Sequence, residues 1–380
     1  MTDMPRSWLL TAALVVIFVC LAAAPFLFPG VRALDTAARI CVFIILVASY
    51  DLLLGYTGVV SFAHTMFFGM GAYGVALTSS NMGRSFEALA MGTGYGILAA
   101  IVVAAIIGLF SLRVRAIFFA MITLAVASAV AVLVSQLSGI TGGEDGLTFQ
   151  IPRELTPAMR YSEFPARGLE PENVWSVLFG PLGFDDLWRP LPITGKILNY
   201  YLVFITMVLA LFLMLRIVHS PFGRTLQAIR ENEFRAEAIG YRVVRYRVAA
   251  TCLSAAFAAL AGAVFAIWVR YVGPDTTLSF DIMIDILLMV VIGGMGTIWG
   301  AVIGVTLFKL AQGYLQDLMA SGQAATADIP LLPILLEPDR WLLWLGVLFV
   351  LSVYFFPSGI VGSLRARAVR RAEIKARGAL

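Results

Sequence analysis

Few side chains in this sequence could carry out covalent chemistry. The two histidines are His64 and His219, and neither the HExxH pattern of zinc hydrolases nor the GxSxG pattern of serine hydrolases occurs. The three cysteines fall inside apolar stretches, at spacings typical of neither a disulfide nor a metal site. We therefore expect no catalytic residue and no bound metal.

The sequence also lacks a recognisable nucleotide site. The phosphate-binding loop GxxxxGK[ST] requires a lysine, and none of Lys196, Lys309 and Lys375 stands in that context. If ATP drives the function of this chain, a separate subunit must therefore bind the ATP and its Mg²⁺.

The elements that carry these residues are strongly apolar. Hydrophobic residues make up 60% of the 380 and charged residues 13%, whereas an average soluble domain is about 25% charged. A helix needs about 20 apolar residues to cross a bilayer. We predict an all-α polytopic membrane protein with about ten transmembrane helices, in apolar segments at 8–28, 38–54, 58–78, 89–110, 114–136, 198–218, 246–271, 282–295, 297–319 and 341–357.

Basic residues predict how the chain is oriented. They gather at Arg113 and Arg115, between Arg216 and Arg247, and in the tail Arg365–Arg377, all on one side if every segment crosses. Both termini are then cytoplasmic. Residues 1–364 are predicted to form one transmembrane domain with an external loop at 137–197. Residues 365–380 form a basic cytoplasmic tail that suits anionic membrane lipid, so the net charge of +4 does not indicate nucleic-acid binding.

Two glycine-rich stretches interrupt the apolar pattern, GYTGVVSFAHTMFFGMGAY at 55–73 and IGGMGTIWGAVIG at 292–304. Such interruptions can mark broken helices around a translocation path, or they can simply permit close helix packing. For His64, the alternative to lining a path is a hydrogen bond to a free carbonyl of a broken helix. The residues that we predict for the path or its broken helices are Gly58, Ser61, His64, Gly293, Gly294 and Gly296.

Charged residues at the external side are candidates for a gate or for contact with a binding protein. They are Glu144 and Asp145 in TGGEDG, and Arg270 at the end of an apolar segment. A plain glycine turn would equally explain the first two residues. An arginine that extends toward the membrane interface would explain the third.

A charged segment, Ser220–Gly240, lies between two long apolar segments. Ser220 can cap a helix, Pro221 suits its first turn, and Gly240 can end it. Glu231 and Arg235 are spaced to support that helix. Its apolar face would hold Leu226, Ile229, Ala236 and Ile239. A helix of this kind lies at the membrane surface and exposes its polar face, either to a partner protein or to solvent alone.

The stretch SPFGRTLQAIRENEFRAEAIGYRVVRYR closely resembles the cytoplasmic loop of permeases from bacterial branched-chain amino acid importers of the ATP-binding-cassette class. GYTGVVSFAHTMFFGMGAYGVAL, TGGEDGL and VVIGGMGTIWGAVIG resemble further motifs of that family, in the same order. Val59, Ala63 and Thr65 depart from the first of these motifs, where the family commonly has Gln, Gly and a small residue.

The resemblance implies a permease subunit in the bacterial inner membrane that carries a small solute, a branched-chain amino acid. It implies as partners a second, homologous permease, two cytoplasmic ATP-binding subunits and a periplasmic solute-binding protein. Residues 220–240 would be the coupling helix that contacts the ATPase, with contact residues Gly223, Arg224, Ala228, Arg230, Glu231, Ala236 and Gly240. Relatives of the family carry urea, other amides or aromatic acids, so the motifs leave the solute open.

The sequence also allows two functions other than that of an ATP-driven permease. An ion-coupled secondary carrier would need ionisable groups within the spans, and the candidate carboxylates Asp51, Asp281 and Asp285 lie toward span ends. A scaffolding membrane protein would have no use for glycine-broken helices.

Overall fold

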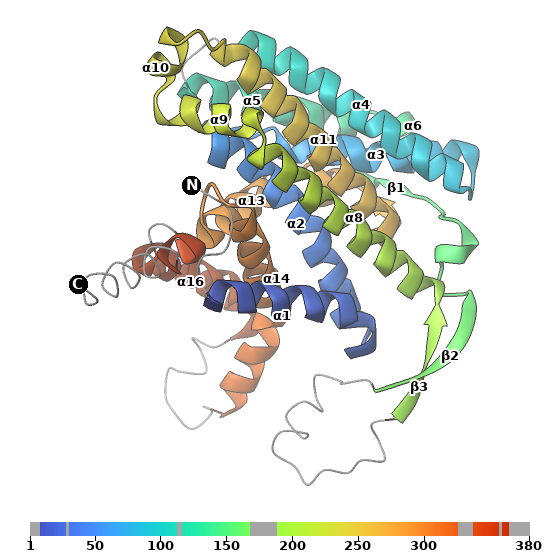
Figure 1. Cartoon of the computed structure of the whole chain (residues 1–380). Helices are drawn as coiled ribbons and strands as arrows, with labels where there is room; N and C mark the ends of the chain where they lie inside the picture. The colour runs from blue at the N-terminus through green and yellow to red at the C-terminus, as the bar shows by residue number, and fades with distance from the viewer. Residues whose placement is uncertain are drawn as a thin grey trace, which may run out of the picture. The chain divides into compact units, whose positions relative to one another are not determined.

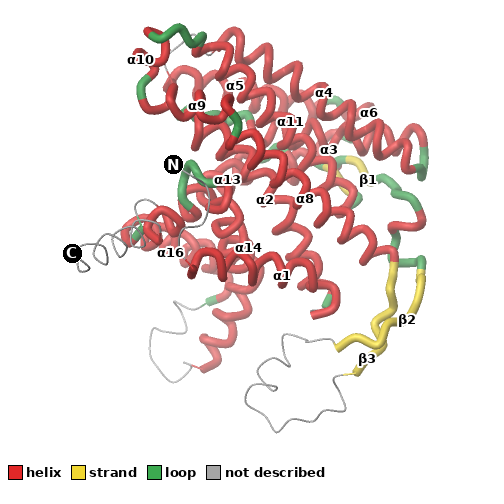
Figure 2. The backbone as a smooth tube through the Cα atoms, viewed as in Figure 1, coloured by secondary structure: helices red, strands yellow, loops and turns green. Residues whose placement is uncertain are grey.

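The computed structural model describes residues 8–27, 30–111, 116–167, 188–325, 337–356 and 359–364. Arg113, Arg115 and the predicted tail 365–380 lie outside the described residues. The chain forms two compact units, one of Phe18–Ile286 and one of Met1–Ile17 with Leu287–Leu380. Figures 1 and 2 show the elements of both.

The prediction of an all-α membrane protein is confirmed, and each of the ten predicted segments contains a helix. In the described residues, eight helices are long and apolar enough to cross a membrane. They are α1 (Trp8–Leu27), α2 (Val31–Thr57), α4 (Phe86–Ser111), α5 (Ala116–Gln136), α8 (Gly195–His219), α11 (Val243–Val269), α13 (Phe280–Gly293, with the turn before it) and α14 (Ile298–Ala325). The other two segments contain α3 (His64–Met82), which is rich in glycine and polar residues, and α16 (Trp341–Phe355), which has 15 residues.

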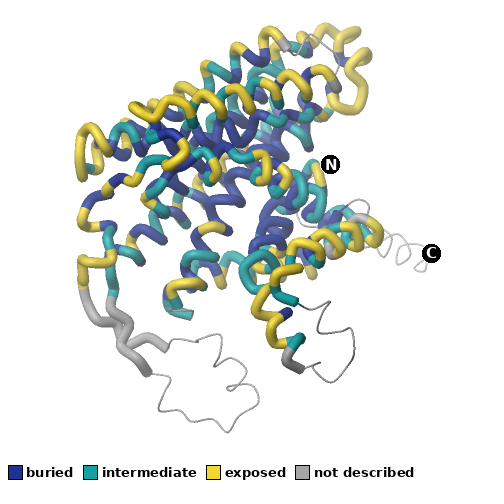
Figure 3. The backbone as a smooth tube through the Cα atoms, turned by 180° about the vertical axis from the view of Figure 1, so that it is seen from behind, coloured by how far each residue is buried: buried dark blue, intermediate teal, exposed yellow. Residues whose placement is uncertain are grey.

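The core of the unit Phe18–Ile286 lies around α2, α3 and α11. Helix α2 is apolar over most of its length and is buried on nearly all sides, as expected for a helix without a polar face (Figure 3). Helix α11 packs against α2, α3 and α4, and α8 packs against α2. Ser254 of α11 donates a hydrogen bond to the carbonyl of Ser49 in α2, at 2.6 Å.

Glycines bring α3 close to its neighbours. A Cβ added to Gly71 would lie 1.8 Å from the carbonyl oxygen of Ala259, and one added to Gly262 would lie 1.8 Å from that of Phe68. Gly74 meets the backbone of α4 at Gly92 and Gly96 in the same way. The glycines inside α3 therefore serve close packing, and the break in the first glycine-rich stretch is confined to residues 58–63, between α2 and α3.

Short elements gather at the two ends of this unit. One end holds α6 (Ser138–Thr141), η1 (Gly143–Asp145), η2 (Arg153–Leu155), the antiparallel pair β1 (Leu147–Thr148) and β4 (Tyr271–Val272), and the hairpin of β2 (Arg160–Arg167) and β3 (Trp188–Thr194). The other end holds α9 (Pro221–Glu231) and α10 (Glu233–Ala238). Helix α8, 25 residues long, runs from one end to the other (Figure 1). The predicted external loop and the predicted charged segment thus lie at opposite ends of the same helices.

In the other unit, the second glycine-rich stretch forms a tight turn between α13 and α14. Gly294 and Gly296 have positive φ angles of 111° and 82°, which side chains other than glycine rarely adopt. A Cβ on Gly293 would lie 2.0 Å from the carbonyl oxygen of Gly300. This stretch therefore combines a broken helix at 294–297 with close packing of the flanking helices. The other described parts of this unit are residues 8–17 of α1, η4 (Pro338–Arg340), α16 and a short helical segment at 359–364.

Candidate functional site

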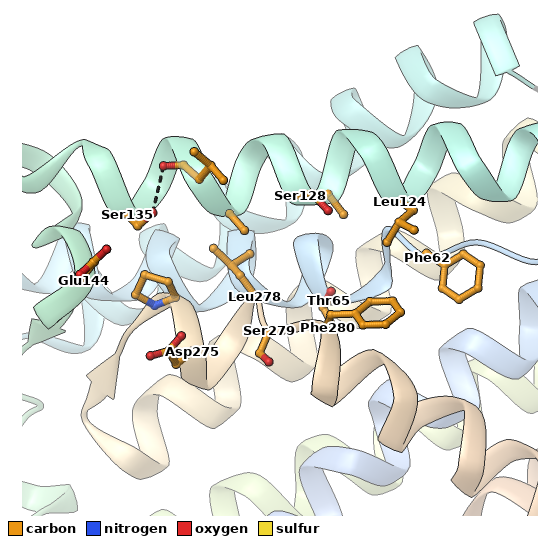
Figure 4. Close-up of a pocket in the computed structure, with 14 residues that line it drawn as sticks. Phe62, Thr65, Leu124, Ser128, Ser135, Glu144, Asp275, Leu278, Ser279 and Phe280 are labelled. Atoms are coloured by element: carbon orange, nitrogen blue, oxygen red, sulfur yellow. Dashed lines mark hydrogen bonds between the residues drawn. The ribbon is translucent and has the colours of Figure 1, made fainter.

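A groove with a volume of about 540 Å³ lies in the unit Phe18–Ile286, between α5 and residues 274–280 (Figure 4). Its size falls within the range of about 300–1,000 Å³ that is usual for small-molecule sites. The residues that line it are Phe62, Thr65, Leu124, Ala127, Ser128, Ala131, Val132, Ser135, Glu144, Pro274, Asp275, Leu278, Ser279 and Phe280.

Helix α5 forms one wall of the groove because its lining residues recur every three or four positions, which places them on one helix face. The wall runs from Leu124 to Ser135, eleven residues apart. At 1.5 Å per residue the groove is about 16 Å long. It therefore reaches from the end that holds η1 well into the helical part of the unit.

The inner part of the groove is mainly apolar. Phe62, in the loop between α2 and α3, and Phe280, at the start of α13, have ring centroids 6.2 Å apart. The backbone N–H of Phe62 donates to the hydroxyl of Thr123 at 3.0 Å, which holds the loop against α5. Thr65 also lines this part (Figure 4) and is 2% exposed.

The outer part of the groove carries two exposed carboxylates, Glu144 and Asp275. The turn that positions Glu144 depends on Gly142, Gly143 and Gly146, which all have positive φ angles. Pairing of β1 with β4 fixes this turn beside Pro274 and Asp275. The structure thus brings Glu144 to the groove, together with a second carboxylate, Asp275, that was not predicted from the sequence.

The other predicted gate residues lie outside the groove. The backbone carbonyl of Asp145 accepts a hydrogen bond from the hydroxyl of Tyr271, at 3.1 Å, so this residue takes part in the turn. Arg270 is exposed and ends α11 in a left-handed conformation, with a φ angle of 63°. Its carbonyl accepts from the N–H of Phe149 at 3.3 Å. Their contact with a binding protein stays a prediction.

His64 is buried in the core and does not line the groove. Its Nε2 atom lies 2.8 Å from the hydroxyl of Ser49 and 3.2 Å from the carbonyl oxygen of Leu46, both in α2. Ser61 is also buried, and its hydroxyl accepts from the N–H of Ala63. Leu46 lies in the middle of the continuous helix α2, so His64 bonds a carbonyl inside a helix and not a free carbonyl of a broken helix.

The predicted helix Ser220–Gly240 is interrupted at Asn232, which corrects the prediction of one continuous helix. Asn232 has an extended backbone and accepts a hydrogen bond from the N–H of Arg235, so it caps a second helix, α10. The break separates Glu231 from Arg235, and their predicted pairing within one helix was therefore wrong. The ion pair that forms joins Glu233 to Arg247 of α11, with contacts of 2.7 and 3.0 Å.

The predicted ends of this segment are confirmed. The hydroxyl of Ser220 accepts from the N–H of Gly223, Pro221 is the first residue of α9, and Gly240 follows α10 with a φ angle of 97°. Leu226, Ile229 and Ala236 are buried as predicted. Ile239 is 69% exposed, contrary to prediction, because the break at Asn232 rotates α10 relative to α9.

The predicted coupling residues differ in accessibility. Gly223 and Ala236 are buried, and a Cβ on Gly223 would lie 2.2 Å from the carbonyl oxygen of Val218. These two residues pack the segment against the helices and offer no surface to a partner. The exposed members are Arg224, Ala228, Arg230, Glu231 and Gly240, and the adjacent Phe234 is 83% exposed.

Arg230 connects this segment to the end of α2. Its guanidinium donates to the carbonyl oxygen of Gly55, in the last turn of that helix. Its Cγ atom lies 3.4 Å from where a Cβ on Gly58 would be, and Gly58 ends α2 in a left-handed conformation. A cation is favourable at this point because the last carbonyls of a helix carry partial negative charge. Gly58 thus contacts the charged segment and does not line the groove.

Replacing Asn232 by alanine should loosen α10 by about 1 kcal/mol, because the cap hydrogen bond is lost. Hydrogen exchange at residues 233–238 would measure this. Glu237→Ala, an exposed change in the same helix, is the control. Equal exchange in both variants would contradict the capping role of Asn232.

Apolar spans, a groove of small-molecule size and an exposed charged segment define a multi-pass membrane protein suited to moving a small solute. A model of the family described as "Branched-chain amino acid transport system / permease component" matches residues 32–353. The chain therefore belongs to this permease family, whose members are transport subunits and work with ATPase and binding-protein partners.

Individual relatives agree with this membership. The chain is 27% identical to the high-affinity branched-chain amino acid transport system permease protein LivM of Escherichia coli strain K12, over 93% of this chain and 75% of LivM. The corresponding protein of Salmonella typhimurium is 27% identical, over 87% and 70%. The autoinducer 2 import system permease protein LsrC of Salmonella paratyphi B is 28% identical over 33% of this chain and 36% of LsrC. No solved structure matches the chain.

Proposed function

We propose that this chain is a permease subunit of an ATP-driven importer in the bacterial inner membrane and forms part of the path for a branched-chain amino acid. The match of the family over residues 32–353 is the observation that carries the proposal. The complex would contain a second, homologous permease, two cytoplasmic ATP-binding subunits that hold ATP and Mg²⁺, and a periplasmic solute-binding protein.

The exposed face of α9 and α10 is proposed to receive the ATPase. Arg224, Ala228, Glu231 and Phe234 are accessible there. Leu226, Ile229 and Ala236 are buried beneath them, so the segment is anchored on the helices and would move with them.

Movement of this segment would reach the groove by a short route. Arg230 contacts Gly55 and Gly58 at the end of α2. The loop that follows, residues 58–63, contains Phe62, which lines the inner part of the groove. Only three residues of chain therefore lie between Gly58 and Phe62, which forms the aromatic pair with Phe280. We infer that displacement of α9 shifts Phe62 and changes how far the groove extends inward.

Reconstitution in liposomes would test this function. The complete complex with its binding protein should accumulate radiolabelled leucine when ATP is supplied on the ATPase side, and should not do so without ATP. Leucine uptake by this chain alone under an imposed ion gradient would instead indicate a secondary carrier. Asp51 of α2, which is 1% exposed, is the carboxylate that such a carrier would use first.

The solute is tested in the same preparation. Uptake of urea or an aromatic acid, with no uptake of leucine, would support the importer function. It would show that the solute is not a branched-chain amino acid. The similarity to LsrC, whose name gives autoinducer 2 as the cargo, makes this comparison necessary.

A further inference from the structure

We propose that the inner half of the groove is a carboxylate-binding site formed by the Thr65 hydroxyl and the first turn of α3, and that the acidic outer half makes the groove selective for zwitterions. The ligand class is an α-amino acid with a small apolar side chain. This inference rests on the proposed function, because it names the groove as the place where the transported solute binds.

The hydroxyl of Thr65, which has no protein partner in the described part of the chain, indicates that a ligand binds in the groove. Its side chain is 2% exposed, and its hydroxyl has no hydrogen-bond partner among the described residues. Although the side chain packs among its neighbours, the hydroxyl faces the groove, where a ligand can displace the water that would otherwise bond it. Thr65 lines the groove and lies across it from Ser128 (Figure 4). An acceptor on a bound molecule would satisfy this hydroxyl.

Helices α3 and α13 both begin beside the groove. Helix α3 starts at His64, one residue before Thr65, and α13 starts at Phe280, which also lines the groove. The first N–H groups of a helix have no partner within it and carry partial positive charge. In α13 the Asp281 N–H already donates to the Ser279 hydroxyl, and Asp281 places a negative charge in the first turn, so the start of α3 beside the Thr65 hydroxyl is the end that favours a carboxylate.

The surrounding surface suits an aliphatic side chain. Phe62, Phe280, Leu124 and Leu278 border the inner half of the groove. Among the described residues no lysine or arginine lines the groove, so a bound carboxylate would depend on the Thr65 hydroxyl and the first turn of α3. A multiply charged anion would not be stabilised there.

The outer half has the opposite polarity. Glu144 and Asp275 line it near the level of Ser135. Ser135 follows Ser128 by seven residues of α5, which corresponds to about 10 Å along the helix. An α-amino acid is too short to touch both halves at once. The carboxylates therefore act through their field, which repels simple anions and orients the ammonium group outward.

The test compares two threonine variants of α3 in the purified complex without its binding protein. Thr65→Val removes the free hydroxyl and keeps the shape of the side chain. Thr78→Val is the matched control, because the Thr78 hydroxyl donates to the carbonyl of Gly74 in its own helix, at 2.7 Å. Thermal unfolding is followed as leucine is added, since a ligand of the folded state raises the Tm.

We expect leucine to raise the Tm of the wild type and of Thr78→Val at similar concentrations. Thr65→Val should need at least about tenfold more leucine for the same rise, because a hydrogen bond to a charged group is lost. Equal leucine dependence in the two variants would overturn the proposal, as would a wild-type Tm that leucine leaves unchanged. ATP-driven leucine uptake by the wild type is measured separately, so the loss of this site would be distinguished from the loss of the proposed function.

The acidic half is tested with ligands that each lack one charge. The wild type should respond to leucine at lower concentrations than to 4-methylpentanoate, which lacks the ammonium group, or to 3-methylbutylamine, which lacks the carboxylate. Glu144→Gln combined with Asp275→Asn should narrow the gap between leucine and 4-methylpentanoate by about threefold, since both side chains are exposed. An unchanged gap would show that these carboxylates do not select the ligand.

Discussion

Replacing Arg230 by glutamate should leave ATP hydrolysis close to normal and lower solute uptake more than tenfold. In the wild type, the guanidinium donates to the carbonyl of Gly55 at the end of α2. A carboxylate cannot donate, and it would be repelled by the partial negative charge of the last carbonyls of this helix. The contact between α9 and α2 would then weaken at the place from which the loop with Phe62 begins.

The loss of uptake should depend on both the positive charge of residue 230 and its N–H donor. Arg230→Lys keeps a cation that can reach the same carbonyl, so we expect most of the uptake to remain. ATP hydrolysis and uptake are measured on the same reconstituted complexes, with assembly checked by co-purification of the ATPase. Normal uptake in Arg230→Glu would remove this residue from the coupling route. Parallel loss of hydrolysis and uptake would mean that it acts in docking the ATPase.

The helices were predictable because each apolar segment is long, and the bilayer requirement for satisfied backbone groups leaves a helix as the simplest structure. The first and last residues of each helix were less predictable. Helix α2 begins at Val31, seven residues before the predicted segment, and includes Arg32, Asp35 and Arg39. Asp35 pairs with Arg39 at 2.8 Å and accepts from the indole of Trp268. Such tertiary partners let a helix extend beyond its apolar part, and they are invisible in a hydropathy pattern.

The charged segment shows what local signals can supply. Its start at Ser220 and its end at Gly240 follow from the preferences of single residues, and both were predicted. The break at Asn232 had a local signal too, because asparagine is as good a helix cap as serine. The continuous spacing of Leu226, Ile229 and Ala236 concealed it.

The groove could not be predicted in this way. Its lining comes from three separate stretches, residues 62–65, 124–144 and 274–280. Their proximity depends on the packing of α3 against α11 and on the pairing of β1 with β4. Glu144 was therefore predictable through its glycine turn, whereas Asp275 was not. Its one signal was a Gly-Pro-Asp turn after a span, which has no chemical meaning until Glu144 lies beside it.

Replacing Gly262 by valine should prevent the stable folding of this subunit. An added Cβ at this position would lie 1.8 Å from the carbonyl oxygen of Phe68, which belongs to the backbone of α3 and cannot move without shifting the whole helix. Overpacking of a tight interior usually costs about 1–3 kcal/mol, and a contact with rigid backbone should exceed that range. The readout is the yield of monodisperse protein and its Tm in detergent.

Gly94→Val is the matched control, because Gly94 also lies within a span and an added Cβ there would have nothing within 4 Å. Valine is a better helix former than glycine, so this variant should keep the yield and Tm of the wild type. If both variants fold equally well, α3 and α11 are not in backbone contact at Gly262. Since α3 carries Thr65 and α11 leads to β4 and Asp275, the groove would then lack the packing that brings its two sides together.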